Sequence, residues 1–172
     1  MTPLLVLVGP PASGKTTVGT AVAAALGVGF RDTDADVEEV AGMSVADVFI
    51  EHGEPHFRAL ERQAVARSLA EHDGVLALGG GAVTDEATRA LLVEYGKDGG
   101  TVVRLDVDLH SAAKRVGLSR DRPLLAVNPR AMLRTMLEAR APLYAEVATA
   151  TVETGGRTPE DVIAEVLEVA RR

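Results

Sequence analysis

The chain has 172 residues, and its 47% hydrophobic and 25% charged residues are typical of one globular domain, here spanning 1–172. A net charge of −7 argues against nucleic acid or an anionic membrane as a partner, although a few arginines could still bind a small acidic substrate. The chain has no cysteine, so we expect no disulfide and no thiolate catalysis. Because no Lys or Arg precedes Lys15, we expect no charged secretory leader, and we expect a cytoplasmic protein. A monomer is the default expectation.

Short apolar runs alternate along the chain with segments of helical spacing. The apolar runs predict strands at 4–8, 28–31, 74–78, 101–107 and 147–152. The other segments predict helices at 15–26, 45–50, 55–72, 84–95, 109–116 and 130–140, and a last helix that starts near Pro159. Ser44 and Thr158 are placed to cap two of these helices. This alternation predicts an α/β fold: a parallel five-stranded sheet with helices on both faces.

The first predicted strand runs into a phosphate-binding motif. Residues 9–16, GPPASGKT, match G-x-x-x-x-G-K-[ST] and lie between a buried strand and a helix, as this motif requires. Backbone N–H groups would point at phosphate oxygens, Lys15 would reach the β- and γ-phosphates, and the Thr16 hydroxyl would bind Mg²⁺. The predicted ATP-binding residues of this loop are Ala12, Ser13, Gly14, Lys15, Thr16 and Thr17.

Phosphate loops of this kind serve GTPases, motor ATPases and small-molecule kinases. GTPases read guanine with an N-K-x-D motif, whereas the one asparagine of this chain, Asn128, is followed by Pro129. The chain also suits a small kinase better than a motor domain by its length. A small-molecule kinase needs acidic groups for Mg²⁺ and for the attacking hydroxyl, and arginines for the transferring phosphoryl group.

An acidic cluster follows the second predicted strand. Residues 30–36, FRDTDAD, place Asp32, Asp34 and Asp36 at alternate positions. Like charges this close are costly unless a cation or a polar ligand shares the site. In an extended segment Asp32 and Asp34 share a face, and ligands of parallel sheets bind at the carboxyl ends of strands, so we expect both to face the phosphate loop. Asp36 is expected to lie in the next helix as a structural residue.

Further motifs follow in order along the chain. They are Phe57-Arg58, Gly79-Gly80-Gly81, Arg122-Pro123-Leu124-Leu125 and Arg140-Ala141-Pro142-Leu143-Tyr144. Together with the phosphate loop and Asp32-Thr33-Asp34, they resemble the shikimate kinase family over nearly the whole chain. The resemblance implies a fold like that of the P-loop nucleoside-monophosphate kinases. It also implies transfer of the ATP γ-phosphoryl group to the 3-hydroxyl of shikimate, giving shikimate 3-phosphate and ADP, a step of aromatic amino acid biosynthesis.

The resemblance implies roles on the nucleotide side of the site. Lys15 would hold the phosphates of ATP, and Thr16 would bind the Mg²⁺ cofactor. Asp32 would act on the Mg²⁺ side, through water. Arg157 would border the adenine.

The resemblance implies a substrate site that agrees with the chemistry of shikimate, a carboxylate bearing three hydroxyls. Arg58 and Arg140 would clamp the carboxylate, because an arginine fork can bind a carboxylate bidentately. Asp34 would receive the hydroxyls and is the candidate base, and the Gly80 N–H would donate to the substrate. Glu61, three residues after Arg58 on the same helix face, could hold that arginine in position.

The resemblance also implies a lid over about 112–126, from which Arg122 would reach the ATP phosphates as a third catalytic residue beside Lys15 and Asp34. Here the chain departs from the simplest family pattern, because 115–123 reads RVGLSRDRP. Arg115 and Arg120 are therefore possible helpers of Arg122.

Two alternatives stay open at this point. One is another small P-loop kinase, such as a gluconate kinase or a nucleoside-monophosphate kinase. The other is a nucleotide-binding protein without catalytic activity, which would be expected to have lost Lys15, Asp34 or Arg122, whereas all three are present.

Overall fold

The computed structural model describes residues 2–117 and 128–172. Its strands form one sheet in the order β2-β3-β1-β4-β5, and every neighbouring pair is parallel. The predicted parallel five-stranded sheet is therefore confirmed. The strands are β1 (Leu5–Val8), β2 (Phe30–Asp32), β3 (Val75–Ala77), β4 (Val102–Asp106) and β5 (Ala150–Glu153).

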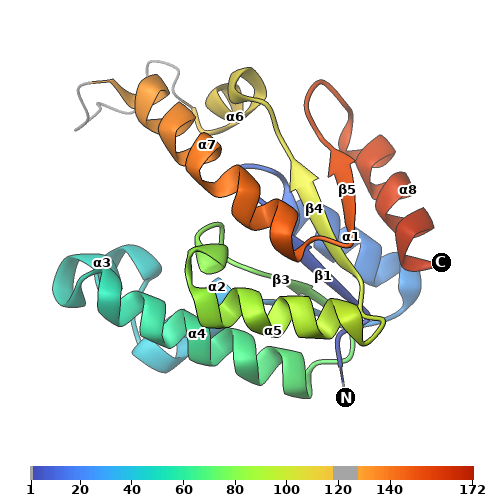
Figure 1. Cartoon of the computed structure of the whole chain (residues 1–172), viewed down its shortest axis with the longest axis horizontal. Helices are drawn as coiled ribbons and strands as arrows, with labels where there is room; N and C mark the ends of the chain where they lie inside the picture. The colour runs from blue at the N-terminus through green and yellow to red at the C-terminus, as the bar shows by residue number, and fades with distance from the viewer. Residues whose placement is uncertain (1, 118–127) are drawn as a thin grey trace.

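Helices cover both faces of the sheet, as Figure 1 shows. They are α1 (Lys15–Leu26), α2 (Thr33–Ala41), α3 (Val45–His52), α4 (Glu54–Glu71), α5 (Glu86–Lys97), α6 (Leu109–Arg115), α7 (Pro129–Val147) and α8 (Pro159–Ala170), with a 3-10 turn η1 (Ala82–Thr84). None of the helices in the described ranges is long and apolar enough to cross a membrane.

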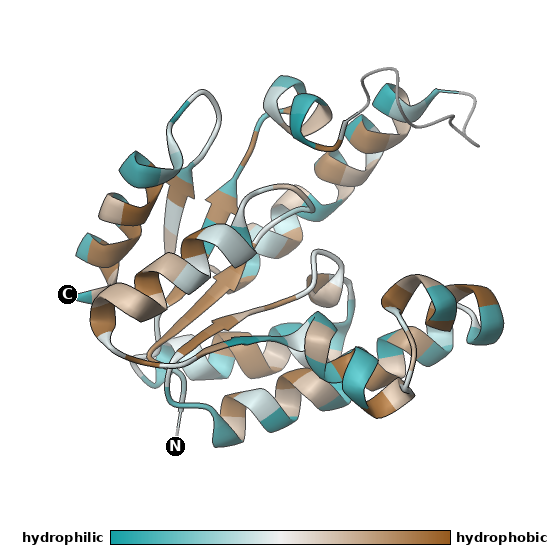
Figure 2. Ribbon diagram, turned by 180° about the vertical axis from the view of Figure 1, so that it is seen from behind, coloured by the Kyte–Doolittle hydropathy of each residue, from teal (hydrophilic) through white to brown (hydrophobic). Residues whose placement is uncertain are grey.

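The central strand β1 divides the hydrophobic core between the two faces. Leu5 and Leu7 pack with α1 and α8, whereas Val6 and Val8 pack with α4, α5 and α7. Figure 2, the view from behind, shows the hydrophobic strands in brown between these layers. Each fully buried Leu or Val contributes about 1.5–3 kcal/mol, so both layers are held firmly against the sheet.

A smaller apolar cluster joins α2, α3 and α4 beyond the sheet. It consists of Val37, Val48, Phe57 and Ala64, all buried. Phe57 immediately precedes Arg58, so its burial fixes the stretch of α4 that carries this arginine. The predicted caps at Ser44 and Thr158 are confirmed: their hydroxyls accept hydrogen bonds from the N–H groups of Asp47 and Asp161.

The structure corrects the prediction for the end of α7, the longest of the described helices. We expected a helix over 130–140 and a strand over 147–152. Instead α7 continues through Pro142 to Val147, and β5 begins at Ala150. The extra turns bury Tyr144 and Val147 in the core, and this packing compensates for the missing proline N–H.

Candidate functional site

The phosphate loop joins β1 to α1 with an unusual backbone. Ala12 and Gly14 have positive φ angles of +64° and +94°, a region that non-glycine residues rarely adopt. At Gly9 a Cβ atom would lie 2.5 Å from the Leu105 carbonyl oxygen, so only glycine fits. No side chain in the described residues caps α1, which leaves its first N–H groups available to an anion.

Lys15 lies at the first position of α1 and curls back over the loop. Its Nζ donates hydrogen bonds to the carbonyl oxygens of Gly9 and Pro10, at 2.8 and 3.0 Å. Burial lowers the pKa of Lys15 to about 8, although the charges of Asp34 and Asp32 act in the opposite direction. Phosphate oxygens could replace the two carbonyl oxygens as acceptors and would favour the charged form.

Thr16 and Asp32 form a pair of oxygen ligands beside the loop. The Thr16 hydroxyl donates to Asp32 Oδ2 at 3.3 Å. Across the two described ranges, no three His, Cys, Asp or Glu side chains gather as a metal site on their own. One hydroxyl with one carboxylate suits Mg²⁺, which usually keeps several waters and takes further oxygens from phosphates.

The structure changes how Asp34 reaches the site. We expected Asp32 and Asp34 to share a face of an extended segment, which is wrong because α2 starts at Thr33. Asp32 is the N-cap of this helix and accepts the Asp34 N–H at 2.9 Å. The first helical turn still brings both carboxylates to one cavity of about 280 Å³, whose other lining residues come from the phosphate loop and from 78–80.

Asp34 has an environment suited to a base. Burial raises the pKa of Asp34, the negative charge of Asp32 raises it further, and Lys15 acts in the opposite direction. A carboxylate with a raised pKa accepts a proton more readily. Asp36 differs, since it accepts hydrogen bonds from Arg31 Nε at 2.8 Å and Ser68 Oγ at 2.9 Å. Its predicted place in the first turn of the helix is confirmed, and these contacts agree with a structural role.

Arg58 is held by acidic side chains of its own helix. Its Nη1 donates to Glu61 Oε1 at 2.7 Å, and its Nε lies 3.4 Å from Glu54 Oε1. Glu61 is only 2% exposed. Burial raises the pKa of Glu61, and the hydrogen bond from Arg58 acts in the opposite direction. The prediction that Glu61 positions Arg58 agrees with this geometry.

The glycines at 79–81 leave room for the site's side chains. A Cβ at Gly79 would lie 2.6 Å from Asp34 Oδ1 and 2.7 Å from Glu61 Oε2. At Gly81 a Cβ would clash with the guanidinium group of Arg58. Any larger residue would therefore push the carboxylates and the arginine apart, so this run is what allows them to meet beside the backbone.

Arg140 on α7 lies on the same side of the molecule as these groups. Burial is the main cause that lowers the pKa of Lys15, and the positive charge of Arg140 lowers it further. Burial raises the pKa of Glu61, and Arg140 acts in the opposite direction. Tyr144, one turn further along α7, donates its hydroxyl to the Gly80 carbonyl oxygen at 2.5 Å. The helix thus brings a second arginine next to the glycine run.

A second cavity of about 280 Å³ lies on the other side of the phosphate loop. Arg115 and Arg157 line it together with Ala12, Gly14 and Thr154. Arg115 donates to the carbonyl oxygens of Ala12 and Thr154, at 3.2 and 2.7 Å. Arg157 donates to the Glu153 carbonyl oxygen at 3.0 Å and pairs with Glu165.

The predicted residues lie in three places in the described part of the chain. Arg58 lies against Gly81, and Arg140 lines a separate cavity of about 740 Å³ together with Thr84 and Leu143. Asp32, Asp34 and Gly80 line one cavity beside the phosphate loop and Arg157 the other. Arg122 lies outside the described residues. Arg115 was expected only as a helper of Arg122, and no sequence signal indicated that it would contact the phosphate loop itself.

Comparisons with known proteins show which family the chain resembles. A family model described as shikimate kinase matches residues 11–171. The shikimate kinase of Salinispora arenicola (strain CNS-205) is 63% identical over 96% of both chains. The solved structure of a shikimate kinase from Acinetobacter baumannii in complex with shikimate is 35% identical, covers 98% of this chain and 92% of its own, and has a TM-score of 0.86. A gluconokinase from Sinorhizobium meliloti 1021, 21% identical over 98% of this chain and 91% of its own with a TM-score of 0.60, shares only the fold.

Proposed function

The chain belongs to the shikimate kinase family and is an ATP-dependent kinase that phosphorylates shikimate. We propose that the two cavities beside its phosphate loop bind different parts of the two substrates. The cavity with Asp32, Asp34 and Gly80 takes the acceptor and the γ-phosphoryl group. The cavity with Arg115 and Arg157 takes the adenine end of ATP. The phosphate loop between them then spans the phosphates.

The observation that carries this proposal is that acidic and basic side chains gather around the glycine run, which lines the acceptor cavity. Asp34, the Arg58–Glu61 pair and the glycine run come from three separate segments and pack against one another. Arg140 on α7 lines the neighbouring cavity with Thr84 and Leu143, and its charge acts on both Lys15 and Glu61. Cationic forks at one end and a carboxylate at the other match an acceptor that carries a carboxylate and hydroxyl groups.

In the proposed reaction, the 3-hydroxyl oxygen of shikimate attacks the γ-phosphorus of ATP. The bond from that phosphorus to the β–γ bridging oxygen breaks, the hydroxyl proton passes to the Asp34 carboxylate, and ADP leaves. Lys15 neutralises charge on the phosphate oxygens as the bond breaks. Arg58 and Arg140 hold the carboxylate end, so that the hydroxyl meets the phosphorus in the correct orientation.

Mg²⁺ fits the oxygen pair of Thr16 and Asp32, the first as a ligand and the second through water. When bound, it would neutralise phosphate charge. Arg122 remains a predicted phosphate ligand from the sequence. Monomeric state, cytoplasmic location and the absence of nucleic-acid or membrane partners also remain proposals, and the net charge of −7 supports the last of them.

Replacing Arg58 or Arg140 by Ala is expected to raise KM for shikimate by about 10- to 100-fold and to change kcat less. Each arginine makes charge-assisted hydrogen bonds in the ground and transition states alike. Steady-state kinetics at saturating ATP provides the measurement. Arg67→Ala is the matched control, because Arg67 pairs with Glu71 on the same helix, at 3.5 Å. If Arg58→Ala behaved like this control, the acceptor cavity would be wrongly assigned.

The affinity for ATP is expected to fall as the pH rises through about 8. The pKa of Lys15 in the free protein is lowered to about 8, so its positive charge is present below that pH and is lost above it. Titration with a non-hydrolysable ATP analogue should give Kd values about tenfold weaker at pH 9 than at pH 7. Lys15→Arg should bind equally at both. Equal wild-type affinity at the two values would contradict the assignment of the lysine.

A further inference from the structure

The glycine run is attached to α7 by one side chain, Tyr144. This side chain is 2% exposed, and its hydroxyl donates to the Gly80 carbonyl oxygen at 2.5 Å. Arg140 lies four residues earlier, which is one helical turn. A single turn of α7 thus carries both a proposed ligand of the acceptor carboxylate and the hydrogen bond to Gly80, whose N–H is proposed to donate to the acceptor.

Gly80 depends on this contact more than its neighbours do. The Gly79 N–H donates to the Thr33 hydroxyl at 3.1 Å, and the carbonyl oxygens of Gly79 and Gly81 accept from Ala82 and Thr84, both at 3.0 Å. Within 2–117 and 128–172, Tyr144 supplies the one hydrogen bond to the Gly80 carbonyl. Glycine has a wide choice of backbone angles, so without this bond the peptide after Gly80 would be free to rotate.

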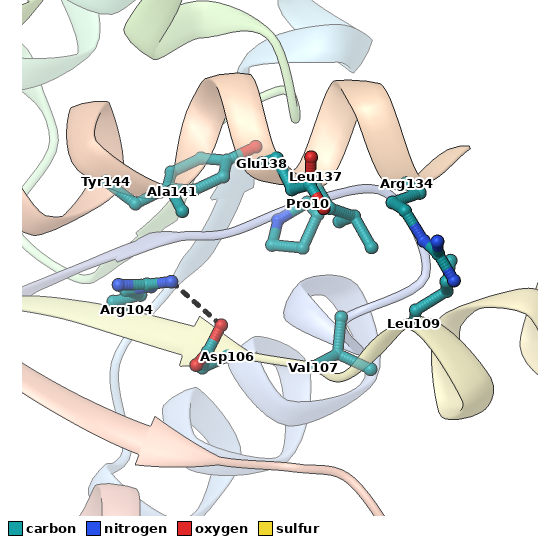
Figure 3. Close-up of a pocket in the computed structure, with 10 residues that line it drawn as sticks. All are labelled: Pro10, Arg104, Asp106, Val107, Leu109, Arg134, Leu137, Glu138, Ala141 and Tyr144. Carbon is teal, nitrogen blue, oxygen red and sulfur yellow. Dashed lines mark hydrogen bonds and ion pairs between the residues drawn. The ribbon is translucent and has the colours of Figure 1, made fainter. Parts of the chain in front are cut away.

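The ring of Tyr144 is supported from behind. Figure 3 shows Arg104 and Asp106 facing Tyr144 and Ala141 across a cavity of about 420 Å³ that Pro10 of the phosphate loop also lines. The Arg104 guanidinium lies 5.9 Å from the ring centroid and pairs with Asp106 at 2.9 Å. A cation held over the ring stabilises one orientation of the side chain, so the hydroxyl stays directed at Gly80.

We propose that Tyr144 is a positioning residue of the acceptor site, whose hydroxyl fixes the Gly80 peptide at a set distance from Arg140. The inference rests on the proposed roles of Gly80 and Arg140. Removing the hydroxyl keeps every charged side chain of the site but takes away the bond to Gly80 and the contact with Arg140, which lets the loop shift relative to α7. The affinity for shikimate should therefore fall, while the affinity for ATP should stay the same.

The chain offers a matched control, because it has only two tyrosines. Tyr95 also donates its hydroxyl to a backbone carbonyl oxygen, that of Pro3, at 2.8 Å. Tyr144→Phe and Tyr95→Phe thus remove the same kind of hydrogen bond, one at the glycine run and the other near the N-terminus.

Kinetics of the two variants test the inference. Tyr144→Phe should raise KM for shikimate about tenfold, the loss of one buried hydrogen bond, with KM for ATP changed less than about twofold. Tyr95→Phe should leave both values unchanged. A shikimate KM for Tyr144→Phe equal to that of Tyr95→Phe, or an equal rise in both KM values, would overturn the proposal. Arg140→Ala distinguishes failure of the Tyr144 proposal from failure of the proposed acceptor site. If Arg140→Ala raises KM for shikimate and Tyr144→Phe does not, the acceptor site stands and only the role of Tyr144 is wrong.

A second measurement covers the case in which Tyr144→Phe does not fold. Tyr95→Phe labelled with 3-fluorotyrosine carries a single fluorine probe, at Tyr144. Its ¹⁹F resonance should shift when shikimate is added and stay in place when gluconate is added. An unchanged resonance at saturating shikimate would overturn the proposal.

Discussion

Lys15→Ala is expected to lower kcat by at least about 100-fold while the protein stays folded. The lysine neutralises charge that grows on the phosphate oxygens in the transition state, and removing one such donor typically costs about 10²–10³ in rate. Its contacts in the free protein are two backbone carbonyl oxygens, and removing a charge that burial disfavours offsets the loss of these hydrogen bonds, so stability should change little. Initial rates at saturating ATP and shikimate, with a thermal melt of the same sample, provide the check.

Lys97→Ala is the control for that experiment, since Lys97 lies exposed at the end of α5, away from the phosphate loop. It should match the wild type in rate. Near-normal kcat in Lys15→Ala would mean that the GPPASGKT loop is not the phosphate site.

Asp34→Asn is expected to lower kcat by about 10²–10⁴-fold, the usual contribution of a general base. Its effect on shikimate Kd should be much smaller, because the amide keeps the shape of the carboxylate and can still hydrogen-bond the hydroxyls. The surroundings of Asp34 explain why kcat should fall more than the affinity for shikimate. Burial and the charge of Asp32 raise the pKa of Asp34, which favours its uptake of a proton, whereas Asn cannot take one. Single-turnover rates and equilibrium titrations with shikimate measure the two effects independently.

The neighbouring aspartates make this test specific. Asp32→Asn should lower activity in a way that added Mg²⁺ partly restores, because Asp32 pairs with Thr16. Asp36→Asn should act on stability, because Asp36 binds Arg31 and Ser68. Loss of turnover in Asp36→Asn with a silent Asp34→Asn would show that the acceptor site is built on a different register of this segment.

Features set by neighbouring residues could be predicted from the sequence. The phosphate loop is one example, since strand, glycines and helix follow one another directly and Gly9 and Gly14 mark its turns. The Arg58–Glu61 pair is another, because spacing on one helix decides it. The caps at Ser44 and Thr158 also depend only on adjacent backbone.

Competition between local rules limited the prediction at two places. At 32–34 both an extended segment and a helix start were compatible with the sequence, and the capping carboxylate of Asp32 favoured the helix. At Pro142 the local rule ends the helix, but the burial of Tyr144 and Val147 continues it. In both cases the side chains still reach the site, by a different backbone path.

Two contacts between distant segments had no signal in the sequence. The hydroxyl of Tyr144 meets Gly80 across 64 positions, and Arg115 meets the Thr154 carbonyl across 39. No spacing along the chain encodes such pairs, because they depend on the sheet order, which places β4 between β1 and β5. These contacts connect the two proposed cavities to the helices around them.

The most direct test of the proposed acceptor site is a coupled ADP-release assay with separate acceptors. Wild-type protein with Mg²⁺ and ATP should release ADP rapidly with shikimate and only slowly with gluconate or a nucleoside monophosphate. The shikimate-dependent rate should fall sharply in Asp34→Asn. Faster release with another acceptor, or a rate that does not depend on any acceptor, would contradict the assignment of this cavity to shikimate.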